Sequence, residues 1–324
     1  MKFSSMKKVA LILTVLILGF GHLNAQTEND AINAFNKGVQ LSQSKNYADA
    51  IKAFQESIDL FDQLEMTDSE NRMKAAEQVP SLQYKIAIGY YKQKDYDNAI
   101  EAFKKTQKLA AEYGNAKYES RAEKVIPQLY YIKGKSLYES GDADGAIELY
   151  NKAIEMKPGY GTAYLRKAQV MKDKDNEEEF KKAIDAAIAT KDKKVVGPAK
   201  KLAANFFLQK GAEAFKAENF ATAESYFNNV FDYQEATADM HYQLALVYNG
   251  QSKWDDAIEA CNKALTFFEG EETTKDAKIY YELGNAYKGK GDTNAACEAY
   301  KKAAKGDYAE HANYEIEHTL KCDK

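Results

Sequence analysis

Residues 130–153 read YYIKGKSLYESGDADGAIELYNKA, and residues 280–303 read YYELGNAYKGKGDTNAACEAYKKA. Both stretches begin with a tyrosine pair and carry the same glycine, alanine and later tyrosine at the same spacing, while most charged positions differ. Residues that control packing therefore recur, and residues suited to a surface do not. This predicts a structural unit that the chain repeats.

The spacing inside the stretch indicates a helical hairpin. Gly134 and Ala146 lie twelve residues apart, and Tyr150 and Ala153 follow. Two helices approach closely only where side chains are small, so we expect them to cross at Gly134 and Ala146, with the aromatic ring beside the contact. Asp and Gly between them, as in Ser140-Gly141-Asp142, predict the end of one helix and the cap of the next. The same step recurs at Gly38 with Ala50, Ala87 with Ala99, Gly211 with Ala223, Ala245 with Ala257 and Gly284 with Ala296.

This pattern resembles the tetratricopeptide repeat. In residues 127–158 the family's marker positions are occupied by Tyr130, Lys133, Gly134, Leu137, Ala146, Tyr150, Ala153 and Pro158. The resemblance implies an all-α fold, a right-handed superhelical solenoid of about seven hairpins over residues 26–307, with a capping helix over residues 308–324. One repeat is degenerate, since Phe180 and Ile184 stand where a small and an aromatic residue are expected.

The first three repeats are longer than the others. Gly38, Ala87 and Gly134 are separated by 49 and 47 residues, whereas the corresponding small residues Gly211 and Ala245 are separated by 34. At 3.6 residues per turn the excess is roughly four turns, which predicts about two extra turns on each of two adjacent helices. The turns then fall near residues 66–69 and 113–115, with Pro80 and Pro127 inside or at the start of long helices.

Residues 1–25 have the pattern of a secretory signal peptide. Lys2, Lys7 and Lys8 precede an apolar run over residues 9–20, and Ala25 supplies a small residue at the exit. We expect cleavage after Ala25 and no membrane insertion of the mature chain; an uncleaved anchor is the alternative. The expected location is the periplasm or envelope.

Composition excludes several functional classes. Of 324 residues, 45% are hydrophobic and 29% are charged, which is typical of a globular chain. Without the three signal-peptide lysines the net charge falls from −4 to −7, and no basic cluster lacks interleaved acid, so nucleic acid is not an expected partner. No phosphate-binding loop or nucleophile motif is present, so we expect neither an enzyme nor a cofactor.

The tail allows two interpretations. His311, Glu315, His318 and Cys322 share one side of a helix and could include metal ligands. Ala309, Ala312, Ile316 and Leu320 form an apolar stripe on the other side, which suits a cap over the last repeat. We expect the cap and no metal.

The cysteines are few for an exported protein. Cys261 and Cys297 occupy core positions of their repeats and are expected to be small buried side chains. A Cys297–Cys322 bridge that fastens the cap is an open alternative.

In tetratricopeptide proteins the first helix of each hairpin lines a concave groove, where extended peptides or helices bind. The resemblance places eight aromatic residues there: Phe35, Tyr84, Tyr91, Tyr131, Tyr138, Phe215, Tyr242 and Tyr281. Tyrosine combines a large apolar face with a hydroxyl group and is enriched in recognition surfaces. The alternative is that these rings pack against one another as core.

The expected function is therefore a noncatalytic scaffold or adaptor of the bacterial cell envelope that binds a protein or peptide in an aromatic-lined groove. The alternative is a structural subunit of a larger envelope assembly that uses convex or end surfaces.

Overall fold

The computed structural model of the protein describes residues 27–268 and 274–322, all of which lie in helices, turns or irregular segments, without a strand among them. The expected signal peptide lies outside these residues. The chain forms two compact units, Met1–Pro158 and Gly159–Lys324, called here the N-terminal and C-terminal units. No helix within the described ranges is long and apolar enough to span a membrane.

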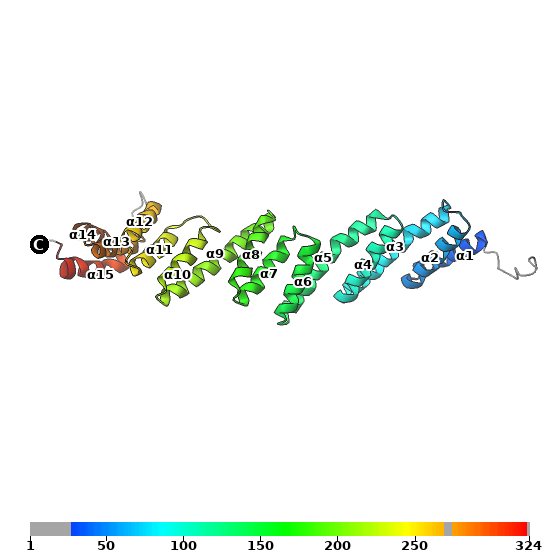
Figure 1. Ribbon diagram of the computed structural model, residues 1–324, viewed down its shortest axis with the longest axis horizontal. Coiled ribbons are helices and arrows are strands. Elements are labelled where there is room, and N and C mark those ends of the chain that lie inside the picture. The colour runs from blue at the N-terminus through cyan, green and yellow to red at the C-terminus, as the bar shows by residue number, and fades with distance from the viewer. Residues whose placement is uncertain (1–26, 269–273, 323–324) are drawn as a thin grey trace, which may run out of the picture. The chain divides into compact units, whose positions relative to one another are not determined.

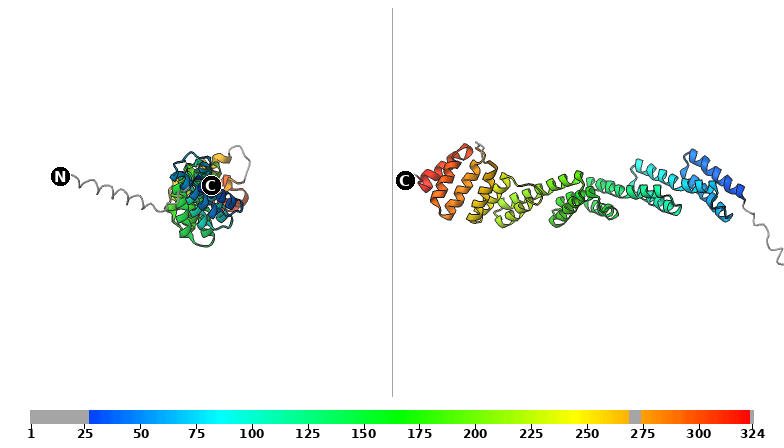
Figure 2. Two further views of the ribbon diagram at one scale, coloured as in Figure 1. Left: turned by 90° about the vertical axis from the view of Figure 1, so that its right-hand side faces the viewer. Right: turned by 90° about the horizontal axis from the view of Figure 1, so that it is seen from above.

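The N-terminal unit consists of three helical hairpins in chain order (Figure 1). They are α1 (Glu28–Gln43) with α2 (Tyr47–Gln63), α3 (Glu70–Lys92) with α4 (Tyr96–Glu112), and α5 (Ala116–Glu139) with α6 (Ala143–Met156). The hairpins are stacked: α2 packs on α3, α4 packs on α5, and the first helices α1, α3 and α5 also contact one another in sequence. The right-hand view of Figure 2 shows the successive hairpins of this unit from above.

The C-terminal unit continues the same alternation. Its hairpins are α7 (Gly161–Asp173) with α8 (Glu177–Ala189), α9 (Lys193–Lys216) with α10 (Phe220–Val230), α11 (Ala238–Gly250) with α12 (Trp254–Leu265), and α13 (Ala277–Lys290) with α14 (Thr293–Ala303). Short helical segments follow: η1 (Thr266–Phe268) after α12, and η2 (Gly306–Tyr308), α15 (Ala309–Tyr314) and η3 (Glu315–Leu320) after α14. The prediction of an all-α chain with seven hairpins is confirmed for the described residues.

In four of the repeats a glycine inside the first helix makes room for an aromatic ring. A Cβ atom on Gly134 would lie 2.9 Å from the Tyr150 ring and 3.2 Å from the Ala146 carbonyl oxygen. The same relation holds between Gly38 and Phe54 at 2.8 Å, and between Gly284 and Tyr300 at 2.7 Å. The ring therefore lies directly on the glycine, and any side chain there would displace it.

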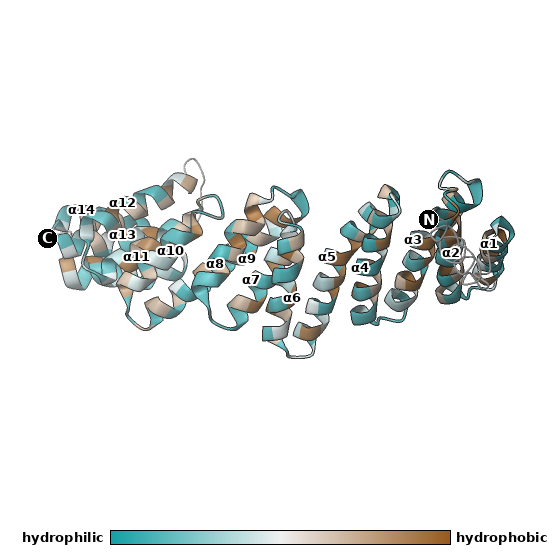
Figure 3. Ribbon diagram, turned by 45° about the vertical axis from the view of Figure 1, so that its right-hand side comes forward, coloured by the Kyte–Doolittle hydropathy of each residue, from teal (hydrophilic) through white to brown (hydrophobic). Residues whose placement is uncertain are grey.

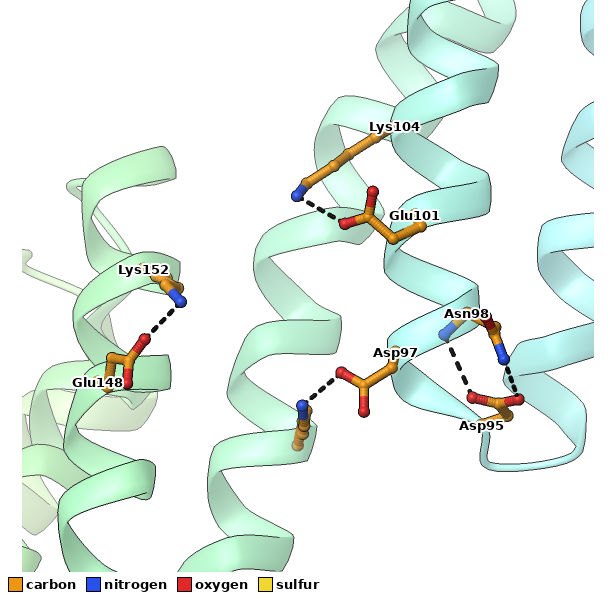
Figure 4. A network of polar contacts seen from close by, with 8 residues as sticks. Asp95, Asp97, Asn98, Glu101, Lys104, Glu148 and Lys152 are labelled. Carbon is orange, nitrogen blue, oxygen red and sulfur yellow. Dashed lines mark hydrogen bonds and ion pairs between the residues drawn. The ribbon is translucent and has the colours of Figure 1, made fainter.

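The turns between helices follow the expected chemistry. Gly141 and Gly291 end their helices with positive φ angles of 96° and 85°, a conformation that glycine adopts without strain. The side chains of Asp142 and Asp292 then cap α6 and α14 by accepting hydrogen bonds from backbone N–H groups. Figure 4 shows the same cap at α4, where Asp95 accepts from Asn98, and the nearby Glu101–Lys104 ion pair.

The core lies between the helices of each unit. The helices labelled in Figure 3 carry both hydrophobic and hydrophilic positions, coloured brown and teal. The largest fully buried side chains include the repeat aromatics Phe54, Phe103, Tyr150 and Tyr300. The degenerate repeat also packs well, since Phe180 and Ile184 are fully buried and the Phe180 ring lies 4.3 Å from that of Phe206.

Spacing predicted the long helices only in part. The turns at residues 64–69 and 113–115 are confirmed, and Pro80 and Pro127 lie inside the 23-residue α3 and the 24-residue α5. However, α9 is also 24 residues long and contains Pro198, which was not expected. The sequence signal was the separation of 43 residues between Ala168 and Gly211, which is longer than the standard repeat.

The tail forms a cap on the last hairpin. Ala312 and Ile316 are buried against Ala296, Tyr300 and Ala303. A disulfide joins Cys297 of α14 to Cys322, so the alternative left open by the sequence is the one observed. Cys297 is therefore a bridged residue as well as a buried one, whereas Cys261 is a free, fully buried thiol whose pKa is raised by burial.

Candidate partner-binding surface

One face of the row α1, α3 and α5 carries apolar and aromatic side chains at successive helical turns. We call these positions the outer stripe: Ile32, Phe35 and Val39 in α1, Tyr84, Ile88 and Tyr91 in α3, and Tyr131 and Tyr138 in α5. Within each helix consecutive members are three, four or seven residues apart and therefore share a face. All are half-buried except Tyr91, which is 40% exposed.

The outer-stripe aromatics rest on the repeat aromatics beneath them. The ring centroids of Phe35 and Phe54 lie 5.6 Å apart, those of Tyr84 and Phe103 5.2 Å apart, and those of Tyr131 and Tyr150 5.9 Å apart. Edge-to-face and tilted contacts at such distances hold a ring in a defined orientation. Each of these rings is thus packed on the core by one side and exposed on part of its surface.

The remaining three predicted residues belong to the C-terminal unit. Phe215 is half-buried and makes an edge contact with Phe220. Tyr242 and Tyr281 lie beside the chain's own tail: the Tyr242 and Tyr308 hydroxyls are 3.5 Å apart, and the Tyr281 and Tyr308 rings 5.4 Å apart. His311 also approaches Tyr281, with ring centroids 6.3 Å apart. The structure brings Phe35, Tyr84, Tyr91, Tyr131 and Tyr138 together on one unit, while the tail covers part of the surface of Tyr242 and Tyr281.

A polar network lies between α11, α13 and α14. Asn249 donates through Nδ2 to the Glu282 carboxylate at 2.9 Å and to the Glu282 backbone carbonyl at 3.0 Å. Asn285 donates to the same carboxylate at 3.1 Å and accepts from the Tyr300 hydroxyl at 2.7 Å. Burial raises the pKa of Glu282, against the opposing effects of the Asn285 and Asn249 hydrogen bonds and the Lys288 charge. Sequence spacing gave no sign of this network, because its members come from three helices.

Replacing Glu282 by glutamine is expected to stabilise the protein at pH 7 and to have little effect at pH 4. A raised pKa means that the folded state holds this proton more tightly than the unfolded chain, whose glutamate pKa is about 4.3. The stabilisation is complete below the unfolded pKa and is lost as the pH rises through the folded pKa. Glutamine keeps an acceptor for both asparagines and carries no charge. Thermal unfolding of both proteins between pH 4 and pH 7 measures the difference; an equal shift at all pH values would contradict this explanation.

Some cavities among the described residues lie on other surfaces. One of about 380 Å³ is lined by residues of α2, α3 and α4, including Ile51, Gln83 and Tyr90. Another of about 370 Å³ lies among α10, α11 and α12 and includes His241 and Lys263. None of the eight predicted aromatic residues lines either cavity.

The histidines and acids of the tail do not form a metal site. Within the described ranges no group of three histidine, cysteine, aspartate or glutamate side chains is arranged to hold an ion. Cys322 is bonded to Cys297, and Glu315 accepts a hydrogen bond from Lys288 at 2.9 Å. The four tail residues are thus committed to different neighbours or to solvent.

Comparison with known families agrees with this geometry. Residues 84–161, 137–200 and 234–308 each match a model of the tetratricopeptide repeat, and together these ranges cover more than half of the chain. The chain belongs to the tetratricopeptide repeat family. The hairpin α1–α2 and most of α9–α10 lie outside the matched ranges. In these two hairpins Gly38 lies against the Phe54 ring and Gly211 against the Phe227 ring, the same contact that Gly134 and Gly284 make in matched repeats. The structure therefore extends the tetratricopeptide repeats to these hairpins.

Several solved tetratricopeptide structures resemble the chain at low identity. The TPR domain of P58(IPK) is 13% identical, with 90% of this chain and 98% of that chain covered and a TM-score of 0.35. The TPR2AB domain of yeast Sti1, solved in complex with pHSP90, is 18% identical, with coverages of 90% and 95% and a TM-score of 0.31. YrrB, described as a TPR protein with an unusual peptide-binding site, is 20% identical, with coverages of 57% and 90% and a TM-score of 0.33. No curated protein matched the sequence.

Proposed function

We propose that this tetratricopeptide repeat protein is a noncatalytic scaffold or adaptor of the bacterial cell envelope, and that it binds a protein or peptide partner on the outer stripe of α1, α3 and α5. The observation that carries the proposal is the arrangement of Phe35, Tyr84 and Tyr131, each fixed on a repeat aromatic by one side and exposed on part of its surface. Rings that are already ordered lose little conformational entropy when a partner covers them.

The envelope setting rests on the sequence of residues 1–25. A basic start, a short apolar run and Ala25 have the order of a secretory signal peptide. Under this proposal, protein recovered from the envelope begins at Gln26. Recovery of a chain that begins at Met1 in the membrane fraction supports an anchor instead.

Replacing Tyr131 and Tyr138 by alanine is expected to weaken partner binding about thirtyfold, because truncating a central aromatic of an interface typically costs about 2 kcal/mol or more. The rings are only half-buried, so helical content should remain close to wild type. Quantitative pull-down from envelope extract with the wild-type protein and this variant measures the effect.

A matched control removes two tyrosines from other surfaces. Tyr90 and Tyr314 are 36% and 62% exposed and lie outside the outer stripe. The Tyr90→Ala, Tyr314→Ala protein should retain every partner that the wild type captures. If the Tyr131→Ala, Tyr138→Ala protein keeps its partners while folded, the outer stripe is not the binding surface, and the structural-subunit alternative is favoured. If it unfolds, these tyrosines belong to the core.

A further inference from the structure

The outer stripe of α5 continues toward the start of the helix as a row of cations. Lys117, Arg121 and Lys124 precede Tyr131 and Tyr138 at steps of three, four or seven residues, so that all five side chains share one face of the helix. All three cations are exposed to solvent. They lie in the extra turns by which α5 exceeds an ordinary helix of the repeat.

No carboxylate of the described residues neutralises these three cations, whereas several other lysines of the N-terminal unit are paired with one. Lys74 pairs with Glu70, Lys104 with Glu101, and Lys133 with Asp97. Among the described residues, none of the three α5 cations forms an ion pair with an acidic side chain. Their positive charge is therefore available to a ligand.

The cationic row is held next to the aromatic part of the outer stripe. The Tyr118 ring lies 5.5 Å from Lys117 Nζ and 5.5 Å from the Arg121 guanidinium carbon. The Tyr118 hydroxyl accepts a hydrogen bond from Ser81 at 2.9 Å, and its ring lies 5.4 Å from that of Tyr84. Tyr118 thus connects α5 to α3 and provides a cation–π surface that orients two of the three cations.

From this arrangement we infer that the partner segment is an acidic peptide, with carboxylates facing Lys117, Arg121 and Lys124 and apolar or aromatic side chains facing Tyr131 and Tyr138. This inference rests on the proposed function and adds the chemistry of the partner. A guanidinium group binds a carboxylate through two parallel hydrogen bonds, and matching charge raises both the association rate and the specificity. The half-buried rings of Tyr131 and Tyr138 offer apolar surface, which suits uncharged side chains.

The distance from Lys117 to Tyr138 along α5 determines how long the bound peptide segment must be. Lys117 and Tyr138 are 21 positions apart on one helix, which corresponds to about 31 Å at 1.5 Å per residue. An extended peptide covers that distance with about nine or ten residues at roughly 3.3 Å each.

The surroundings favour a peptide over a nucleic acid. A polyanionic strand needs a broad basic surface, whereas Glu119 and Glu123 lie on α5 itself and Glu70 and Glu77 on the neighbouring α3. The net charge of the whole chain is also negative, at −4. A short segment with a few carboxylates can meet the three cations without approaching these acids.

The test is a selection from a random displayed peptide library against the purified full-length protein, followed by anisotropy titration of labelled winning peptides. We expect the winners to be net negative, with aromatic or aliphatic residues beside the acidic ones. The Lys117→Glu, Arg121→Glu, Lys124→Glu protein should bind them at least tenfold more weakly. Raising the salt concentration from about 50 mM to about 500 mM should also weaken wild-type binding, because screening shortens the range of charge interactions.

A control with the same change of charge separates this effect from net charge. Lys37, Lys105 and Lys108 are exposed, lie outside the outer stripe and have no ion pair among the described residues. The Lys37→Glu, Lys105→Glu, Lys108→Glu protein should bind the winners within about twofold of wild type, a difference below about 0.5 kcal/mol.

Other results would contradict the acidic-peptide inference, the proposed function, or both. Winners that are neutral or basic, or that bind the Lys117→Glu, Arg121→Glu, Lys124→Glu protein with unchanged affinity, contradict the acidic-peptide inference. If such winners still lose affinity for the Tyr131→Ala, Tyr138→Ala protein, the proposed function stands without it. If no peptide is selected, or neither variant changes binding, both fail. Equally tight binding of a single-stranded oligonucleotide or of phosphatidylglycerol vesicles would show a general anion surface and also contradict the inference.

Discussion

Replacing Gly134 by leucine is expected to lower the free energy of unfolding of the N-terminal unit by about 3 kcal/mol, near the upper end of the usual cost of overpacking a core. A Cβ atom alone would lie 2.9 Å from the Tyr150 ring, and leucine adds three further carbon atoms in that direction. Tyr150 is fully buried, so its ring could move only by displacing the side chains packed around it. Chemical denaturation followed by circular dichroism measures the change.

Gly89 provides a matched control in the same unit. It also lies inside a long first helix, α3, but a Cβ atom there meets nothing within 4 Å. Leucine at position 89 should be neutral or should stabilise the helix by up to about 1 kcal/mol, because glycine is a poor helix former. Equal destabilisation by Gly89→Leu and Gly134→Leu would show that helix propensity, and not contact with Tyr150, determines the cost.

Replacing Cys322 by serine is expected to destabilise the tail by about 3.5 kcal/mol, the chain-entropy value for a loop of this size. The bridge to Cys297 closes a sequence separation of 25 residues across α14 and the tail. The core formed by α10 to α14 includes no tail residue, so the tail should open locally without unfolding of the unit. Amide hydrogen exchange should become faster in α15 and η3 and remain slow in α11 and α12.

Reduction of the wild-type protein is the control for this variant. Dithiothreitol should make wild-type exchange in the tail equal to that of Cys322→Ser and should leave the variant itself unchanged. Because Tyr308 and His311 contact Tyr242 and Tyr281, the opened tail should also expose these two tyrosines to solvent. Unchanged protection of the tail after loss of the bridge would show that apolar packing alone holds it.

The residues of single hairpins could be predicted from the sequence. The contact of Gly134 with Tyr150 is encoded by two residues sixteen positions apart on adjacent helices, so the spacing itself reports the packing. The capping side chains of Asp142 and Asp292 accept hydrogen bonds from N–H groups only three residues later, so these contacts are also encoded by nearby residues. The positions of the long α3 and α5 followed from the distance between consecutive markers.

The candidate surface was predictable only in part. The resemblance to the tetratricopeptide repeat pointed to the aromatic positions of α1, α3 and α5, and the structure adds that the rings of Phe35, Tyr84 and Tyr131 lie on the repeat aromatics beneath them. The cationic row of α5 was missed, although Lys117 and Lys124 continue the seven-residue step of Tyr131 and Tyr138 and Arg121 lies between them at steps of four and three. The net charge of a helix does not reveal a row of cations on one face, because acidic residues on its other faces cancel their charge.

The sequence by itself determined the repeat, its hairpins, its turns and the apolar stripe of the tail, because each of these depends on residues within a few helical turns of one another. Only the tertiary structure decided that Tyr242 meets Tyr308, that Cys322 reaches Cys297 and that Glu282 is held by Asn249 and Asn285. These contacts join different helices, and a repeated pattern specifies how neighbouring hairpins stack but not where a non-repeating tail or a single polar side chain comes to lie. Their geometry depends on the summed positions of all the helices between them, which no local spacing records.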